Sequence, residues 1–212
     1  MTVDKPAKLT ARRADELRLT IALAARDMSL AAGSTSATVE RICETVGIAP
    51  RTFHRHFPVK EDVVLPLFRR FGSLSLDMLA VADVDGDAVA VLVEAFSTEV
   101  PRRGRMDVDR AFLALMISDP QYRLRWLDWG QDLVEPLTGF LDRRFDLDNE
   151  PYVRDLPAQL IVQACRYAYE DWAEHGNFAR LRATLSSAMR MITGSLEPLD
   201  RPCRTAYRVP RT

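Results

Sequence analysis

The chain has 212 residues, of which 47% are hydrophobic, and its 29 lysines and arginines nearly balance its 30 aspartates and glutamates. This composition is typical of a globular protein and excludes a chain that is collagen-like or disordered throughout. No apolar run approaches the roughly 18–20 residues that cross a bilayer, and the N-terminus has no apolar signal core. With three widely separated cysteines, these features predict a cytoplasmic protein that does not contact the membrane.

The hydrophobic pattern predicts helices almost everywhere, because apolar residues recur at spacings of three and four and no run alternates as a strand does. The first helix is predicted from Thr10, as its N-cap, to Ala32. Two short helices follow, one between Thr38 and Gly47 and one that Pro50 opens.

Longer helices are predicted for the rest of the chain. They are expected over residues 60–71, 87–100, 106–118, 120–145, 155–176 and 178–196. Gly72 is a candidate bend, and Pro136 is expected to kink or break the helix over 120–145. Asp87 and Asp155 are the predicted caps of their helices. The final segment, 198–212, is rich in proline and arginine and is expected to be poorly ordered.

Residues 38–57, TVERICETVGIAPRTFHRHF, have the spacing of a helix-turn-helix, in which two short helices meet at a turn that contains Gly47. Apolar residues of this segment, such as Ile42 and Phe53, are expected to pack on the first helix. The opposite side of the second short helix then carries hydrogen-bond donors, which suit the edges of bases in the major groove. A helical corner with a polar outer face explains the same pattern without DNA.

The region from about Arg12 to Val64 resembles the N-terminal DNA-binding domain of the TetR family of one-component transcriptional repressors. The resemblance is carried by the alanine-rich first helix, Thr38 before an apolar run, the Arg-Thr-Phe-x-x-His-Phe motif at 51–57, and the Lys-Glu-Asp sequence at 60–62. Ala49 departs from the family pattern, because members usually carry a serine-like cap there.

The resemblance implies a set of DNA-contacting residues. They are Thr38, Arg51, Thr52, His54, Arg55, His56 and Lys60. Arg51 would read a guanine through a bidentate contact, whereas His56 and Lys60 would donate to backbone phosphates.

Aromatic side chains gather in the second part of the chain, and core packing is the plain interpretation of them. The resemblance implies in addition that a small molecule enters this part and releases the DNA. The expected lining residues are Phe96, Phe112, Met116, Trp126 and Trp129. Few polar residues accompany them, so we expect an apolar or amphipathic effector.

Two apolar stripes on the last two helices predict a homodimer. The first stripe comprises Leu156, Leu160, Ala164, Ala168 and Trp172, and the second comprises Leu181, Leu185, Ala188, Ile192 and Leu196. Small residues among them favour close approach of helices around a two-fold axis. Alternatively, both stripes face the aromatic core of their own chain.

Signals for metal binding are weak. The run from Asp83 to Asp87, with Glu94 beyond it, imitates a calcium-binding loop, but Ala88 stands where such a loop needs glycine. His175 is the only histidine after residue 60, so the Glu-x-x-His pairs of carboxylate-bridged metal proteins are missing. We expect no metal, no cofactor and no catalytic site.

The sequence thus predicts an all-α protein with a helix-turn-helix domain over 1–60, a helical ligand-binding and dimerisation domain over 61–197, and a tail over 198–212. The predicted function is a ligand-responsive transcriptional regulator, expected to be a repressor. It would bind palindromic operator DNA as a dimer, and a small effector would release it. The alternative is a helical ligand-binding or interaction protein that has lost DNA binding, and an enzyme is the third interpretation.

Overall fold

Helices make up the computed structural model, which describes residues 5–98 and 104–199 and contains no strand within those ranges. In chain order they are α1 (Lys5–Ala32), α2 (Val39–Val46), α3 (Pro50–His56), the 3₁₀ helix η1 (Lys60–Val64), α4 (Leu65–Val81), α5 (Ala88–Ser97), α7 (Met106–Ser118), α8 (Pro120–Trp129), the 3₁₀ helix η2 (Gly130–Leu133), α9 (Val134–Asp142), α10 (Pro151–His175) and α11 (Phe178–Thr193). The prediction of an all-α fold is confirmed. None of the helices described is long and apolar enough to cross a membrane.

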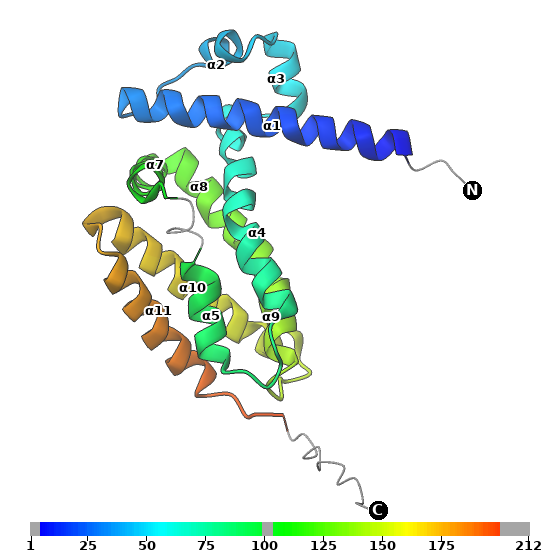
Figure 1. Cartoon of the computed structure of the whole chain (residues 1–212), viewed down its shortest axis with the longest axis vertical. Coiled ribbons are helices and arrows are strands. Elements are labelled where there is room, and N and C mark those ends of the chain that lie inside the picture. The colour runs from blue at the N-terminus through cyan, green and yellow to red at the C-terminus, as the bar shows by residue number, and fades with distance from the viewer. Residues whose placement is uncertain (1–4, 99–103, 200–212) are drawn as a thin grey trace, which may run out of the picture.

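The first three helices form a unit at one end of the molecule, in which α1 lies across α2 and α3 (Figure 1). Ile21, Ile42 and Phe53 meet in its core and are almost fully buried. A helix of seven residues such as α3 is not stable in isolation, so the burial of Phe53 and Phe57 must hold it in place. Residues of α7 and α8 complete this core, which therefore crosses the predicted domain boundary at residue 60.

The remaining helices form a bundle below this unit (Figure 1). α4 leads down from the first unit, and α10 and α11 form an antiparallel pair that packs on α9 and α5. Their core is apolar, with Leu137, Phe140 and Ile161 fully buried. Asp87 caps α5 as predicted, since its Oδ1 accepts hydrogen bonds from the backbone N–H groups of Val89 and Ala90.

Two prolines explain where the predicted helix boundaries are wrong. The helix expected over 60–71 is instead η1 followed by α4, which continues through Gly72 without interruption. Pro66 has no N–H for the carbonyl of Asp62, and the N–H of Leu65 takes that acceptor in a 3₁₀ pattern. The break expected at Pro136 likewise lies upstream, at η2, and Pro136 stands in the first turn of α9.

The first helix and the last two also differ from their predicted bounds. α1 begins at Lys5, so Thr10 lies inside it, and α11 ends at Thr193. α10 begins at Pro151 and continues through Pro157, so Asp155 is not its cap. The carboxylate of Asp155 instead accepts a hydrogen bond of 3.0 Å from the hydroxyl of Thr138 on α9. This contact ties α9 to α10.

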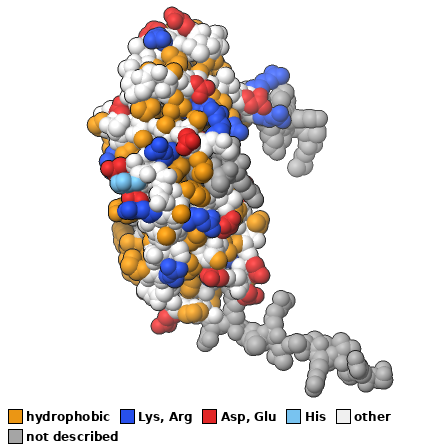
Figure 2. Space-filling view, turned by 60° about the vertical axis from the view of Figure 1, so that its left-hand side comes forward, with side chains coloured by type: hydrophobic (Ala, Val, Ile, Leu, Met, Phe, Trp, Pro, Cys, Tyr) orange, Lys and Arg blue, Asp and Glu red, His pale blue; other side chains and the backbone are white. Residues whose placement is uncertain are grey.

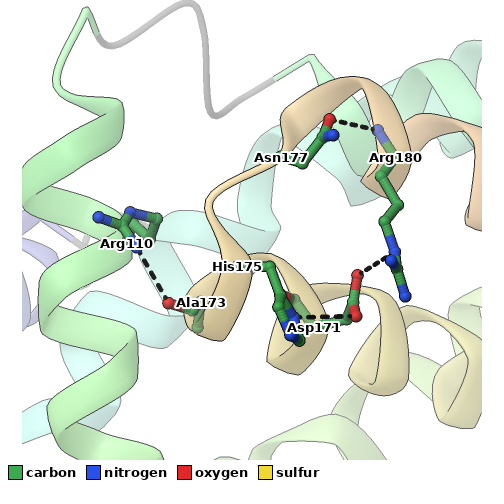
Figure 3. A network of polar contacts seen from close by, with 6 residues as sticks. All are labelled: Arg110, Asp171, Ala173, His175, Asn177 and Arg180. Atoms are coloured by element: carbon green, nitrogen blue, oxygen red, sulfur yellow. Dashed lines mark hydrogen bonds and ion pairs between the residues drawn. The ribbon is translucent and has the colours of Figure 1, made fainter.

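A polar network fixes the corner between α10 and α11 (Figure 3). Asp171 of α10 pairs with Arg180 of α11 at 2.9 Å and lies 3.2 Å from the Nδ1 of His175. Arg110 of α7 reaches the same corner and donates to the carbonyl of Ala173. The network sets the angle at which α11 turns back along α10.

The chain beyond α11 turns back onto the end of α9. Phe145 and Pro198 form an isolated antiparallel bridge, and the N–H of Leu199 donates to the carbonyl of Arg144 at 3.1 Å. The guanidinium of Arg144 stacks 3.8 Å from the centre of the Phe140 ring. The first two residues of the predicted tail are thus paired, and residues 200–212 lie outside the described part of the chain.

Candidate functional site: the helix-turn-helix and an aromatic cavity

The turn between α2 and α3 is built by local backbone contacts. The hydroxyl of Thr38 accepts a hydrogen bond of 3.3 Å from the N–H of Arg41, which confirms Thr38 as the N-cap of α2. Gly47 ends α2 at a φ of 74°, in the left-handed region that glycine adopts without strain. Its N–H donates to the carbonyl of Cys43 at 2.8 Å. This geometry sets the direction in which α3 leaves the turn.

α3 presents a basic face to solvent. Pro50 opens the helix as predicted, and Ala49 before it provides no side-chain cap. Phe53 points into the core, whereas Arg51, His54 and Arg55 are exposed. The structure therefore brings three of the predicted DNA-contacting side chains together on one exposed helix face. Thr52 lies beside them and is half-buried.

His56 differs from its predicted exposed position. Its ring is half-buried, and neither ring nitrogen has a hydrogen-bond partner among the described residues. The last turn of α3, between buried Phe53 and Phe57, carries His56 toward α1. Burial lowers the pKa of His56, and the nearby guanidinium groups of Arg18 and Arg55 lower it further. The neutral imidazole is thus the favoured form in this position.

Lys60 also points away from the α3 face. Its ammonium group donates to the backbone carbonyl of Thr35 at 3.1 Å and lies 5.8 Å from the centre of the Tyr122 ring. The group that we predict to bind phosphate is therefore engaged between the first unit and α8 in this structure.

The sequence analysis did not single out Glu40, which lies beside the basic face of α3. Its pKa lies below the usual range because its own backbone N–H and the hydroxyl of Thr38 donate to the carboxylate, and the nearby His54 lowers it further. Glu40 stands in the first turn of α2, where the helix dipole also favours a negative charge. An acidic residue on a helix of this kind can accept from the amino group of cytosine.

A cavity of about 80 Å³ lies between α4, α7, α8 and α10. Phe96, Phe112, Trp126 and Trp129, four of the five predicted lining residues, contribute to its wall. Met116 does not line the cavity, because it points into the core of the first unit. The lining residues that sequence reasoning missed include Phe68, Phe71, Tyr169 and Trp172.

Aromatic rings form about half of the cavity wall. Trp126 and Trp129 stack at 5.4 Å between ring centres, and the Phe68 ring meets Trp126 edge-on. The hydroxyl of Tyr169 donates to the carbonyl of Phe96 at 2.6 Å, so this polar group is already satisfied. Burial raises the pKa of the Cys165 thiol, which keeps it neutral. Such a wall suits an apolar, ring-containing molecule.

The outer side of α10 exposes large apolar side chains, which we call the α10 apolar face: Tyr152, Leu156, Leu160 and Tyr167. Figure 2 shows hydrophobic side chains between charged ones on one face of the molecule. The two predicted stripes are only partly on the surface. Ala168 and Trp172 of α10 and Leu181, Leu185 and Ile192 of α11 are buried in the core of their own chain.

Comparisons with known proteins agree with this architecture. Residues 21–67, from α1 to the start of α4, match the family model of the bacterial regulatory proteins of the tetR family. No curated protein sequence matches this chain.

Solved structures share the fold over most of the chain. A transcriptional regulator from Rhodococcus sp. Rha1 superimposes with a TM-score of 0.58 at 17% identity, over 86% of this chain and 98% of that one. A TetR transcription regulator from Haloarcula marismortui gives 0.60 at 14% identity, over 86% and 99%. SmeT in complex with triclosan gives 0.57 at 15% identity, over 92% and 99%. SmeT is the repressor of a Stenotrophomonas maltophilia multidrug efflux pump. At these identities the likeness shows the fold.

Proposed function

We propose that this chain, a member of the TetR family of bacterial regulatory proteins, is a transcriptional repressor that binds palindromic operator DNA and releases it when a small molecule enters the aromatic cavity. The observation that carries the proposal is the basic face of α3. Phe53 and the Gly47 turn hold the helix rigidly, and Arg51, His54 and Arg55 remain exposed on it. Donors on a rigid helix can read base edges in the major groove.

We propose an individual role for each of the side chains that the family resemblance singles out. Arg51, in the first turn of α3, is proposed to pair with a guanine, and Thr52 to contact a thymine methyl group or a phosphate. His54 and Arg55 would contact bases or backbone, and Thr38 a phosphate. His56 and Lys60 remain proposed phosphate contacts, and each would have to turn outward from its present position.

Binding to a palindrome requires two copies of the chain related by a two-fold axis. The α10 apolar face supports a homodimer through the last two helices, because Tyr152 is 86% exposed and Tyr167 is 65% exposed in the single chain. Met191 of α11, at 74%, adds a further large apolar side chain. Burial of such groups is the main favourable term in association.

The cavity supports a small apolar or amphipathic effector. Its wall is aromatic, and the hydroxyl of Tyr169 and the guanidinium of Arg166 are engaged with backbone carbonyls. SmeT, whose fold this chain shares, holds triclosan in its solved complex, and a small aromatic compound is the kind of effector we propose. A ligand that binds better to a second conformation would weaken DNA binding by the difference in affinity.

Selection from a pool of random DNA duplexes tests the proposed function. The full chain should enrich sequences with inverted symmetry, and the affinity for them should fall steeply with salt concentration. The half-sites should be centred about one helical turn, roughly 34–36 Å, apart. Failure to enrich any duplex, together with thermal stabilisation by small aromatic compounds, would instead favour a ligand-binding protein without a DNA partner.

A further inference from the structure

α8 contacts both candidate sites, one at each of its ends. Its last residues, Trp126 and Trp129, line the cavity. Its first residues lie against the helix-turn-helix unit and η1. A helix of ten residues spans about 15 Å, so the two contacts are joined by a short rigid element.

The first polar tie joins the start of α8 to the loop between α1 and α2. Asp119 caps α8 with one carboxylate oxygen, and the hydroxyl of Thr35 donates to the other at 2.5 Å. The ammonium of Lys60 completes the tie, since it donates to the carbonyl of Thr35. The hydrogen bond from Thr35 is the largest cause of the lowered pKa of Asp119, which keeps the acceptor charged.

The second polar contact lies six residues further along, at Arg125 of α8. The Nε of Arg125 donates to the carboxylate of Asp62 in η1 at 2.6 Å, and both side chains are largely buried. Between the two ties, Tyr122 is buried in the core of the first unit. A charge-assisted hydrogen bond shielded from water is stronger and more directional than an exposed ion pair. The start of α8 is thus fastened to the DNA-binding unit by polar and apolar contacts together.

We propose that these contacts, which we call the α8 latch and define as Thr35, Lys60, Asp62, Asp119 and Arg125, couple the occupancy of the cavity to the position of the helix-turn-helix. The inference rests on the proposed function and adds the residues through which its two sites communicate. A molecule that displaces the stacked rings of Trp126 and Trp129 moves α8, and the latch passes that movement to the loop before α2. Because coupling between binding sites is reciprocal, DNA binding must also change the conformation of the residues that line the cavity.

The reciprocal direction gives a test that needs no effector. The chain has three tryptophans, Trp126, Trp129 and Trp172, and all of them line the cavity, outside the DNA-binding unit. The wild-type protein is titrated with the best duplex that it selects, and tryptophan emission is followed. A change of emission then reports a conformational change that reaches the cavity, and not direct contact between a tryptophan and DNA. We expect a change of emission in the wild-type protein that saturates with DNA binding.

Two variants break the latch in different places. Thr35→Val removes the donor to Asp119 with little change of shape, and Arg125→Met removes the partner of Asp62. Both should bind the duplex within about threefold of the wild-type affinity and lose at least about half of the emission change. Arg123→Met is the matched control, because Arg123 lies on the same helix and pairs with Glu170 of α10 instead. It should keep the full emission change.

The outcomes separate the two proposals. A wild-type protein that selects no duplex contradicts the proposed function. If the wild-type protein binds DNA and its emission does not change, or if both latch variants keep the change, the latch is wrong and the regulator stands. Loss of the change in Arg123→Met as well would also overturn the latch. Circular dichroism and urea unfolding of each variant show whether a lost emission change comes from misfolding. If one latch variant misfolds, the emission change of the other still tests the latch.

Discussion

Gly72 of α4 and Trp129 at the end of α8 lie so close that a Cβ at position 72 would stand 2.6 Å from the Cζ2 of the indole ring. The missing side chain lets the Cζ2–Cη2 edge of the ring lie against α4, beside Phe68 and at the wall of the cavity. Gly72 therefore has a packing role, and α4 continues through it without interruption. The relationship sets both the distance between α4 and α8 and the width of the cavity.

Gly72→Ala is expected to destabilise the protein and to displace the Trp129 ring. The Cβ clashes with an indole ring that stacks on Trp126, and overpacking of this kind costs about 1–3 kcal/mol. Urea unfolding measures the loss, and a shift of the tryptophan emission reports the displaced ring. The matched control is Gly139→Ala on α9, where a Cβ meets nothing within 4 Å. This variant should gain up to about 1 kcal/mol from helix propensity. Equal effects of the two substitutions would contradict the packing role of Gly72.

Arg51→Ala is expected to remove base reading without removing general affinity for DNA. Loss of a bidentate contact to guanine should weaken binding to the selected duplex by about 1–3 kcal/mol and relax one position of the sequence. Binding to the selected duplex and to random DNA at several salt concentrations separates the two contributions. Arg69→Ala, an exposed arginine of α4 outside the α3 face, is the control and should change neither. An equal loss on both DNAs would make Arg51 a phosphate contact.

His56→Leu is expected to make the folded protein less sensitive to acid. The folded pKa of His56 is lowered, so the unfolded chain, with a pKa near 6.5, binds the proton first as pH falls. Wild-type stability should therefore drop between about pH 7.5 and the folded pKa, and this contribution is absent from the variant. The free energy of unfolding in urea, measured across that range, should fall more for wild type than for His56→Leu. Parallel curves would show that the imidazole titrates alike in both states.

The sequence predicts the helix-turn-helix well because its signals act on adjacent backbone. Thr38 caps the N–H of a residue three positions on, Gly47 supplies its own left-handed turn, and Pro50 fixes its own φ. Each of these effects acts within one helical turn, so it can be predicted without knowing which distant residues pack against it. The effects of Pro66 and Pro136 are also local, but they appear four residues upstream, at the carbonyl that loses its donor.

The sequence predicts side-chain partners less well, because a hydrophobic period identifies the buried side of a helix and not the helix that covers it. Phe112 and Met116 lie one turn apart on α7, yet only Phe112 reaches the cavity. Leu185 has the spacing of an interface residue and is buried in its own chain. The position of Lys60 in the motif implies phosphate binding. In the structure its ammonium group instead contacts the carbonyl of Thr35 and the ring of Tyr122, which come from distant segments.

Asp171→Asn is expected to loosen the corner between α10 and α11. Asp171 is largely buried and holds Arg180 across the turn, while Arg180 itself is more than half exposed (Figure 3). Solvent screening at Arg180 limits the expected loss to about 1 kcal/mol. Urea unfolding of Asp171→Asn measures it. Glu174→Gln, an exposed change of the same kind in the same turn of α10, should lie within about 0.5 kcal/mol of wild type. A corner held by apolar packing alone would leave both variants equally stable.

Leu160→Glu is expected to dissociate the proposed dimer and leave the monomer folded. Leu160 lies in the middle of the α10 apolar face and is 46% exposed in the single chain, so a carboxylate there remains hydrated in the monomer. In a two-fold interface the same substitution occurs twice in one contact, and two charges would lose water together. Sedimentation should therefore give a monomer with unchanged helix content that binds the selected palindrome poorly.

Two further variants decide what such a result means. Val81→Glu places the same charge on another exposed apolar residue, at the end of α4, and should leave the dimer intact. Leu185→Glu places it where the side chain has no exposure, so it should unfold the chain before it changes the oligomeric state. A dimer that survives Leu160→Glu would move the interface away from α10, because a two-fold contact through this face cannot bury both carboxylates without a large loss of affinity.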